Sequence, residues 1–101
     1  MPRLEIDGMV IDETLTKHGR DFYDVFYTEW SAPEEAYNYT IRIKEQPGRG
    51  RGTIIAVHVN DQIVYQSQLS PGYNAVRQAA AQATQRTQQV MQRYDLSRKI
   101  Y

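Results

Sequence analysis

Residues that could carry out chemistry are few and widely separated in this sequence. The only histidines are His18 and His58, there is no cysteine, and no carboxylates are paired at the spacing of metal ligands. The serines lie outside the glycine-flanked pattern of a catalytic nucleophile. We therefore expect ordinary polar roles for both histidines. We predict no catalytic, cofactor or metal site, and a protein that is not an enzyme.

A basic, glycine-rich segment is the most distinctive local feature. It has the sequence PGRGRG over residues 47–52 and carries Arg49 and Arg51. Arginines bind phosphate and carboxylate groups through bidentate hydrogen bonds, and exposed loop amides add to such binding. The glycine spacing fits neither a P-loop nor a dinucleotide fingerprint. A solvated connection between two strands is the alternative. We predict that Arg49 and Arg51 contact a partner, and that Arg42 and Lys44 extend their basic surface.

Three antiparallel strands are predicted to position this loop, over residues 37–44, 54–60 and 63–69. Odd-numbered residues in these segments are mostly β-branched, leucine or aromatic, and the even-numbered residues are mostly polar, as in half-buried strands. Asn60 and Asp61 suit a tight hairpin, because both tolerate a positive φ angle. One face of this meander is therefore apolar and needs a cover.

Two helices are available as that cover. Residues 13–30 place Leu15, Phe22, Phe26 and Trp30 at helical spacing, with Asp12 or Thr14 as a cap and Gly19 as a weak point. Residues 70–94 form a second helix, rich in alanine and glutamine, with Ser70 as its cap. Its uncharged glutamines are either simply solvated or form an adaptable hydrogen-bonding surface inside an assembly. We predict oligomer contacts at Gln82, Gln85 and Gln89.

The fold class that follows is α+β, a three-stranded antiparallel meander with both helices packed on one face. Residues 1–101 form a single domain, in which residues 1–12 are an edge strand or a flexible arm and residues 95–101 are a frayed tail. The predicted core consists of Phe22, Phe26, Trp30, Ile41, Ile43, Ile55, Val57 and Ile63.

The charge is unevenly distributed although the net charge is zero. Residues 1–35 carry nine acids and three bases, and residues 36–101 carry three acids and nine bases. The two parts either neutralise one another within one molecule or attract a neighbouring copy head to tail. No segment approaches the length of a membrane span. No signal peptide is visible. A mature secreted chain, from which the signal peptide has been removed, would look the same.

An ordered set of motifs resembles the CsgE family of curli assembly and transport components. The motif residues are Gly19, Asp21-Phe22-Tyr23, Phe26 and Trp30, then Glu45 and Pro47, then Val59-Asn60 and Pro71. They span residues 12–72 in order. The sequence departs from the family in the GRGRG loop and in the last helix.

This resemblance implies a periplasmic accessory factor of curli secretion. Such a protein would bind the curlin subunit (CsgA-like), restrain its amyloid aggregation, and cap the outer-membrane secretion channel (CsgG-like) from the periplasmic side. A homo-oligomeric ring, with nine subunits to match the channel, is implied. The alternative is a small nucleic-acid-binding module that uses the basic loop and the sheet tyrosines. The zero net charge argues against it, and we expect no nucleic-acid partner.

Overall fold

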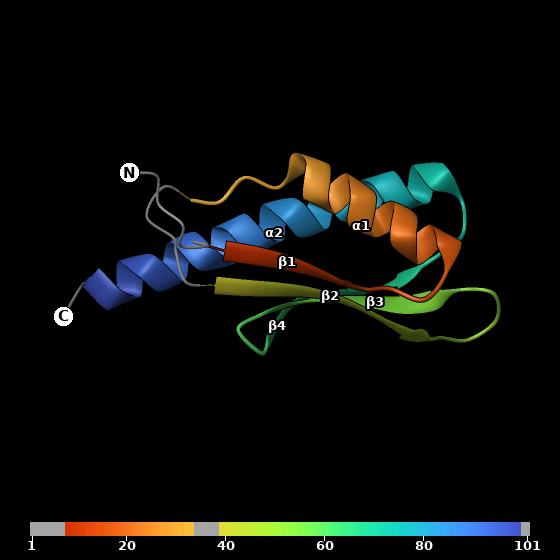
Figure 1. Ribbon diagram of the computed structural model, residues 1–101, viewed down its shortest axis with the longest axis horizontal. Coiled ribbons are helices and arrows are strands. Elements are labelled where there is room, and N and C mark those ends of the chain that lie inside the picture. Colours follow the sequence, from red (N-terminus) through yellow and green to blue (C-terminus); the bar gives the residue numbers. More distant parts are fainter. Residues whose placement is uncertain (1–7, 34–38, 100–101) are drawn as a thin grey trace, which may run out of the picture.

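The computed structural model describes residues 8–33 and 39–99, which form a four-stranded sheet with two helices over one face (Figure 1). Its elements are β1 (Gly8–Glu13), α1 (Lys17–Glu29), β2 (Tyr39–Pro47), β3 (Thr53–Val59), β4 (Gln62–Leu69) and α2 (Tyr73–Lys99). The predicted α+β class and the antiparallel order β2-β3-β4 are confirmed. Tyr37, Ile100, Tyr101 and the first seven residues of the predicted arm lie outside the described residues.

The prediction of a three-stranded sheet was wrong, because β1, which precedes the first helix in the sequence, adds a fourth strand. β1 pairs in parallel with β2, with Val10 opposite Ile41, so the sheet is mixed. Parallel neighbours need a long crossover connection, and α1 is that connection. The alternation in β1 is weak because it has six residues, of which the last two are acidic. Its partner strand also lies far away in the sequence.

Helix α1 begins at Lys17, because Thr16 is its N-cap and not Asp12 or Thr14 as predicted. The hydroxyl of Thr16 accepts a hydrogen bond from the Gly19 amide at 3.0 Å. Asp12 instead accepts from the Thr14 amide at 2.9 Å and closes a turn after β1. Leu15 therefore lies before the helix and is 69% exposed.

Helix α2 packs beside α1 and against β4 (Figure 1). It begins at Tyr73, and the Gly72 carbonyl accepts from the Val76 amide, so Ser70 is not the cap that we predicted. Its buried residues recur at spacings of three and four: Val76, Ala80, Ala83, Thr87 and Met91. Small side chains in this stripe allow close approach of the two helices. The helix continues to Lys99, into the tail that we expected to be frayed.

The core lies between the helices and one face of the sheet, which we call the covered face. Phe22, Phe26, Ile41, Ile43, Ile55 and Val57 are completely buried there. Trp30 is half-buried beside them, and its ring stacks on Phe26 at a centroid distance of 5.7 Å.

Ile63 was wrongly predicted to be in the core and is 56% exposed. The reason is a register shift between β3 and β4. Val57 lies opposite Tyr65, but His58 lies opposite Ile63, so Val64 is an extra residue in β4. A bulge of this kind reverses the side-chain alternation beyond it. Ile63 therefore shares the opposite face of the sheet with His58.

That opposite face carries no helix among the described residues, and we call it the open face. Alternation along the strands assigns to it Arg42, Lys44, Ile54, Ala56, His58, Ile63, Gln66 and Gln68. The predicted hairpin between β3 and β4 is confirmed, since Asn60 and Asp61 have φ angles of 49° and 75°.

Candidate functional site

The predicted basic residues lie on two neighbouring parts of the sheet. Arg49 and Arg51 are exposed at the tip of the hairpin that joins β2 to β3, on either side of Gly50. Gly50 has a φ angle of 65°, which favours glycine, and an added Cβ there would meet no atom within 4 Å. Within the described part of the chain, neither arginine forms an ion pair. Both guanidinium groups are therefore presented to solvent.

Arg42 and Lys44 lie on the open face, on the strand that leads into this hairpin. The Arg42 guanidinium is not free, because its Nη1 donates to Glu13 Oε2 of β1 at 3.0 Å. This ion pair joins the acidic and basic parts of the chain within one molecule. Lys44 is exposed and lies opposite Ala56. Of the two residues predicted to extend the basic surface, Lys44 is thus the more available.

His58 lies on the open face near the end of β3, opposite Arg42. Burial lowers the pKa of its imidazole, and the nearby positive charge of Lys44 lowers it further. The neutral ring is therefore the favoured form at pH 7. The sheet tyrosines of the nucleic-acid alternative, Tyr39 and Tyr65, lie on the covered face instead. They cannot form a base-stacking platform on the open face.

The predicted oligomer contacts Gln82, Gln85 and Gln89 are exposed along α2. Their spacing of three and four residues places them on one side of the helix. Gln88 behaves differently, because its side-chain amide donates to the Ser31 carbonyl after α1. The glutamine-rich helix therefore uses one amide internally and leaves these three available for contact.

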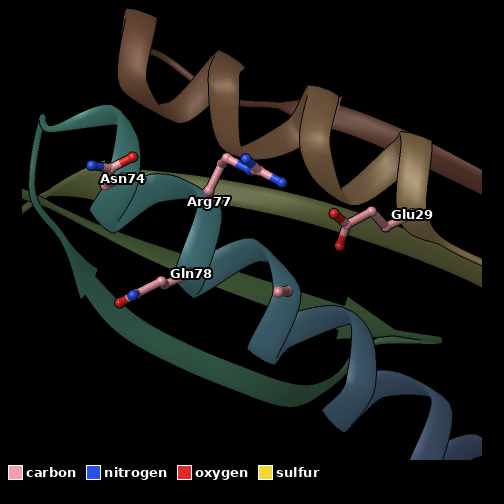
Figure 2. Close-up of a pocket in the computed structure, with 5 residues that line it drawn as sticks. Glu29, Asn74, Arg77 and Gln78 are labelled. Atoms are coloured by element: carbon pink, nitrogen blue, oxygen red, sulfur yellow. The ribbon is translucent and has the colours of Figure 1, made fainter.

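A groove lies between the end of α1 and the first turns of α2 (Figure 2). It is lined by Glu29 of α1 and by Asn74, Arg77 and Gln78 of α2, and Figure 2 shows the Arg77 side chain reaching toward α1. All four side chains are exposed. The groove is open to solvent and lined by exposed side chains, unlike the enclosed pocket typical of a small-molecule site.

The most highly organised polar site is built around Glu45, near the end of β2. Its side chain is fully buried, and one oxygen, Oε1, accepts from the Leu15 and Thr16 amides at 2.6 and 2.9 Å. The other, Oε2, accepts from the hydroxyls of Thr16 and Thr53, each at 2.6 Å. The carboxylate therefore holds the start of α1 against β2 and β3.

The charge of Glu45 fits this role. Burial raises the pKa of the carboxyl, but the hydroxyls of Thr16 and Thr53 and the amides of Leu15 and Thr16 favour the charged form more strongly. The net result is a pKa below the usual value. The anion also lies at the N-terminal end of α1, where the helix dipole stabilises negative charge.

The Glu45 site contains a histidine and a hydroxyl, but it is not arranged for catalysis. His18 Nε2 lies 3.9 Å from Glu45 Oε2 and 3.5 Å from Thr53 Oγ1. The Thr53 hydroxyl donates its proton to the carboxylate, so the histidine does not activate it as a nucleophile. Across residues 8–33 and 39–99, no group of three acidic, histidine or cysteine side chains could hold a metal ion.

Gly19 is required by the Glu45 site, although its position in α1 looked like a weak point in the sequence. A Cβ at this position would lie 2.0 Å from Glu45 Oε1. The carboxylate and its four hydrogen bonds would have to shift. The sequence did not reveal this, because Glu45 is 26 positions from Gly19 and has no periodic relation to it.

We predict that Gly19→Ala lowers the free energy of unfolding by about 1–3 kcal/mol, as overpacking does. In an exposed helix the same change would stabilise by about 1 kcal/mol. Urea denaturation measures the difference, and Thr28→Ala, at an exposed position of α1, is the matched control. A Gly19→Ala protein at least as stable as the wild type would show that the carboxylate tolerates a methyl group.

Neither described helix combines the length and apolar character that crossing a membrane requires. The family model described as "Curli assembly protein CsgE" matches residues 6–101. The chain is 26% identical over 97 residues to the curli production assembly/transport component CsgE of Escherichia coli O6:H1 (strain CFT073), covering 96% of this chain and 73% of that protein. It is 25% identical over 97 residues to the component of that name from Salmonella typhi, covering 96% and 72%. The resemblance seen in the motifs is thereby confirmed: the chain belongs to the CsgE family, whose members are accessory components of curli assembly and transport and not enzymes.

Proposed function

We propose that this protein acts in the periplasm, where it binds the curlin subunit, restrains its aggregation and caps the secretion channel as a homo-oligomeric ring. The observation that carries the proposal is the match of the CsgE family model to residues 6–101. The relatives are named as curli production assembly/transport components. A role in assembly requires surfaces that bind other chains, and the structure offers several.

The exposed hairpin tip supports contact with a partner. Arg49 and Arg51 are exposed and form no ion pair within the described residues. Both can therefore turn toward carboxylates or carbonyl oxygens of a channel or a client. The exposed glutamines Gln82, Gln85 and Gln89 support a separate contact on α2, which we assign to neighbouring subunits. Native mass spectrometry of the pure protein counts the subunits of the ring.

We predict that the double substitution Arg49→Ala/Arg51→Ala weakens channel or client binding without unfolding the protein. Exposed substitutions usually change stability by less than about 0.5 kcal/mol, so the melting temperature should stay nearly constant. The measurements are a pull-down with the secretion channel and the delay of curlin aggregation. Wild-type behaviour of the double variant in both assays would reduce the loop to a connector between strands.

The matched control is Arg77→Ala/Arg93→Ala, which removes the same charge from exposed positions of α2. A second control, Arg49→Lys/Arg51→Lys, keeps the charge and removes the guanidinium geometry. The nucleic-acid alternative is tested with the same proteins by the retardation of a labelled single strand. Retardation that depends on Arg49 and Arg51, with no effect on curlin, would favour that alternative.

A further inference from the structure

β4 forms one edge of the sheet. β4 is the last strand in the order β1-β2-β3-β4, so within the described residues it has a paired strand on one side only. α2 packs against β4, but as a helix it cannot continue the strand ladder. The edge therefore presents backbone groups that another strand could use.

The register identifies those backbone groups. The Asn60 amide donates to the Thr40 carbonyl, and the Thr40 amide donates to Asn60 Oδ1, so these two opposite residues direct their groups toward each other at the end of the β2–β3 ladder. Such pairs alternate along antiparallel strands, which directs the backbone groups of residues 53, 55 and 57 of β3 toward β4. Their partners in β4 are residues 69, 67 and 65. It follows that Gln66 and Gln68, which lie between them, direct their N–H and C=O groups outward.

Contacts near the bulge agree with this assignment and mark where the free edge begins. Arg86 Nε of α2 donates to the Val64 carbonyl at 3.3 Å, so that carbonyl points away from β3 and already has a partner. Within the described residues, no other backbone segment bonds to Gln66 or Gln68. The free edge is therefore the regularly paired stretch from Tyr65 to Leu69.

The chemistry of β4 distinguishes it from the other edge of the sheet. Proteins commonly protect exposed edges with charged side chains or proline. β1 carries Asp12 and Glu13, whereas β4, with the sequence QIVYQSQL, contains neither a charge nor a proline. The side chains of Gln66 and Gln68 are exposed on the open face, directly beside the outward backbone groups. An incoming strand with amide side chains would extend this row, as stacked amides do in cross-β structures.

We propose that the Gln66–Gln68 edge of β4 binds an extended, uncharged client segment by strand addition, the segment bearing glutamine or asparagine on one side. This inference rests on the proposed function and gives the client a binding site. Binding there would occupy the client's own strand edge, and a growing amyloid needs that edge to add further strands.

A client segment fits this edge better than a second copy of the chain. A five-residue strand is about 17 Å long, and only two of its residues offer outward backbone groups. A stable dimer buries about 800 Å² on each partner, which so short a contact does not provide. A small contact is suited to a client that must be released again.

The direct test is amide hydrogen exchange of the wild-type protein, followed by NMR, with a synthetic peptide as the probe. The peptide has seven uncharged residues alternating valine and glutamine, capped at both ends, and is N-methylated along one edge so that it does not self-assemble. Saturating peptide is expected to slow exchange of the Gln66 and Gln68 amides at least about fivefold. A peptide N-methylated along both edges should neither bind nor protect them.

Two substitutions at Gln66 distinguish the contribution of its backbone N–H to peptide binding from that of its side chain. Gln66→Pro removes an outward N–H that the sheet does not use, and proline is tolerated at such edge positions. It should weaken peptide binding at least about fivefold, which is the equivalent of one hydrogen bond. Gln66→Thr removes the side-chain amide but keeps the N–H, so it should weaken peptide binding less than Gln66→Pro does.

Equal peptide binding by wild type and a folded Gln66→Pro variant would overturn the proposal. Absence of protection at saturating peptide overturns it even if that variant does not fold. If the Gln66 and Gln68 amides exchange slowly without peptide and exchange faster on dilution, the edge binds a second copy of this chain. If the protein delays curlin aggregation but the peptide does not slow exchange of the Gln66 and Gln68 amides, the proposed function stands and the proposed binding site is wrong. If the peptide slows exchange of these amides but the protein does not affect curlin aggregation, the edge binds strands and the proposed function is wrong.

Discussion

Phe26→Ala is expected to lower the free energy of unfolding by about 3–5 kcal/mol, as truncation of a buried aromatic residue does. Phe26 is completely buried and stacks on both neighbours of its helical stripe, Phe22 at 6.4 Å and Trp30 at 5.7 Å between ring centroids. It belongs to the cluster that joins α1 to the sheet and to α2. Domains of this size are stable by about 5–15 kcal/mol, so much of the stability would be lost.

Urea denaturation followed by circular dichroism measures this loss. Tyr73→Ala is the matched control, because it also truncates an aromatic residue of a helix, and Tyr73 is 57% exposed at the start of α2. Its free energy of unfolding should change by no more than about 0.5 kcal/mol. A Phe26→Ala protein that melts at the wild-type temperature would mean that the ring does not lie in the core.

Replacing Glu45 with alanine is expected to lower the free energy of unfolding by about 2–4 kcal/mol. The substitution removes the acceptor of four hydrogen bonds, from the Leu15 and Thr16 amides and the Thr16 and Thr53 hydroxyls. A donor left without a partner costs about 1–3 kcal/mol where water cannot replace the bond. The loss should fall mainly on the start of α1, and chemical denaturation with a helix-sensitive signal measures it.

The dependence on pH gives a second readout for Glu45. Its pKa is lower in the folded protein than the usual value of about 4.3 in an unfolded chain. The ionised carboxylate therefore stabilises the fold above the unfolded pKa, and this contribution is lost as pH falls through the folded pKa. Glu45→Gln should flatten the stability profile between about pH 5 and the folded pKa. An identical acid profile for wild type and Glu45→Gln would show that the carboxylate does not contribute in this way.

Alternation predicted the covered face of β2 and β3 because both strands pair regularly and without interruption. Ile41, Ile43, Ile55 and Val57 are all buried as their odd numbering requires. The same rule placed Ile63 on the wrong face, because one additional residue at Val64 reverses the pattern. Nothing in the local composition of β4 marks that position as a bulge.

The parts that the sequence did not predict depend on contacts between residues far apart in the chain. Weak alternation left β1 undecided between an edge strand and an arm, and its pairing with β2 decides it. Glu45 accepts three of its four hydrogen bonds from Leu15 and Thr16, about 30 residues earlier. Arg42 looked available for a partner because Glu13 was assigned to the first helix, whereas it is the last residue of β1 and lies beside β2. The exposed positions of Arg49 and Arg51 were easier to anticipate, because a glycine-rich hairpin tip has no apolar side chain to bury.

The parallel pairing of β1 with β2 also favours one order of assembly during folding. β2, β3 and β4 are joined by short connections, whereas β1 reaches β2 only after the whole of α1 has crossed the sheet. Closing a longer loop costs more entropy, so the local hairpins form ahead of the distant pairing. We therefore expect β2 to be an open edge during folding until β1 pairs with it.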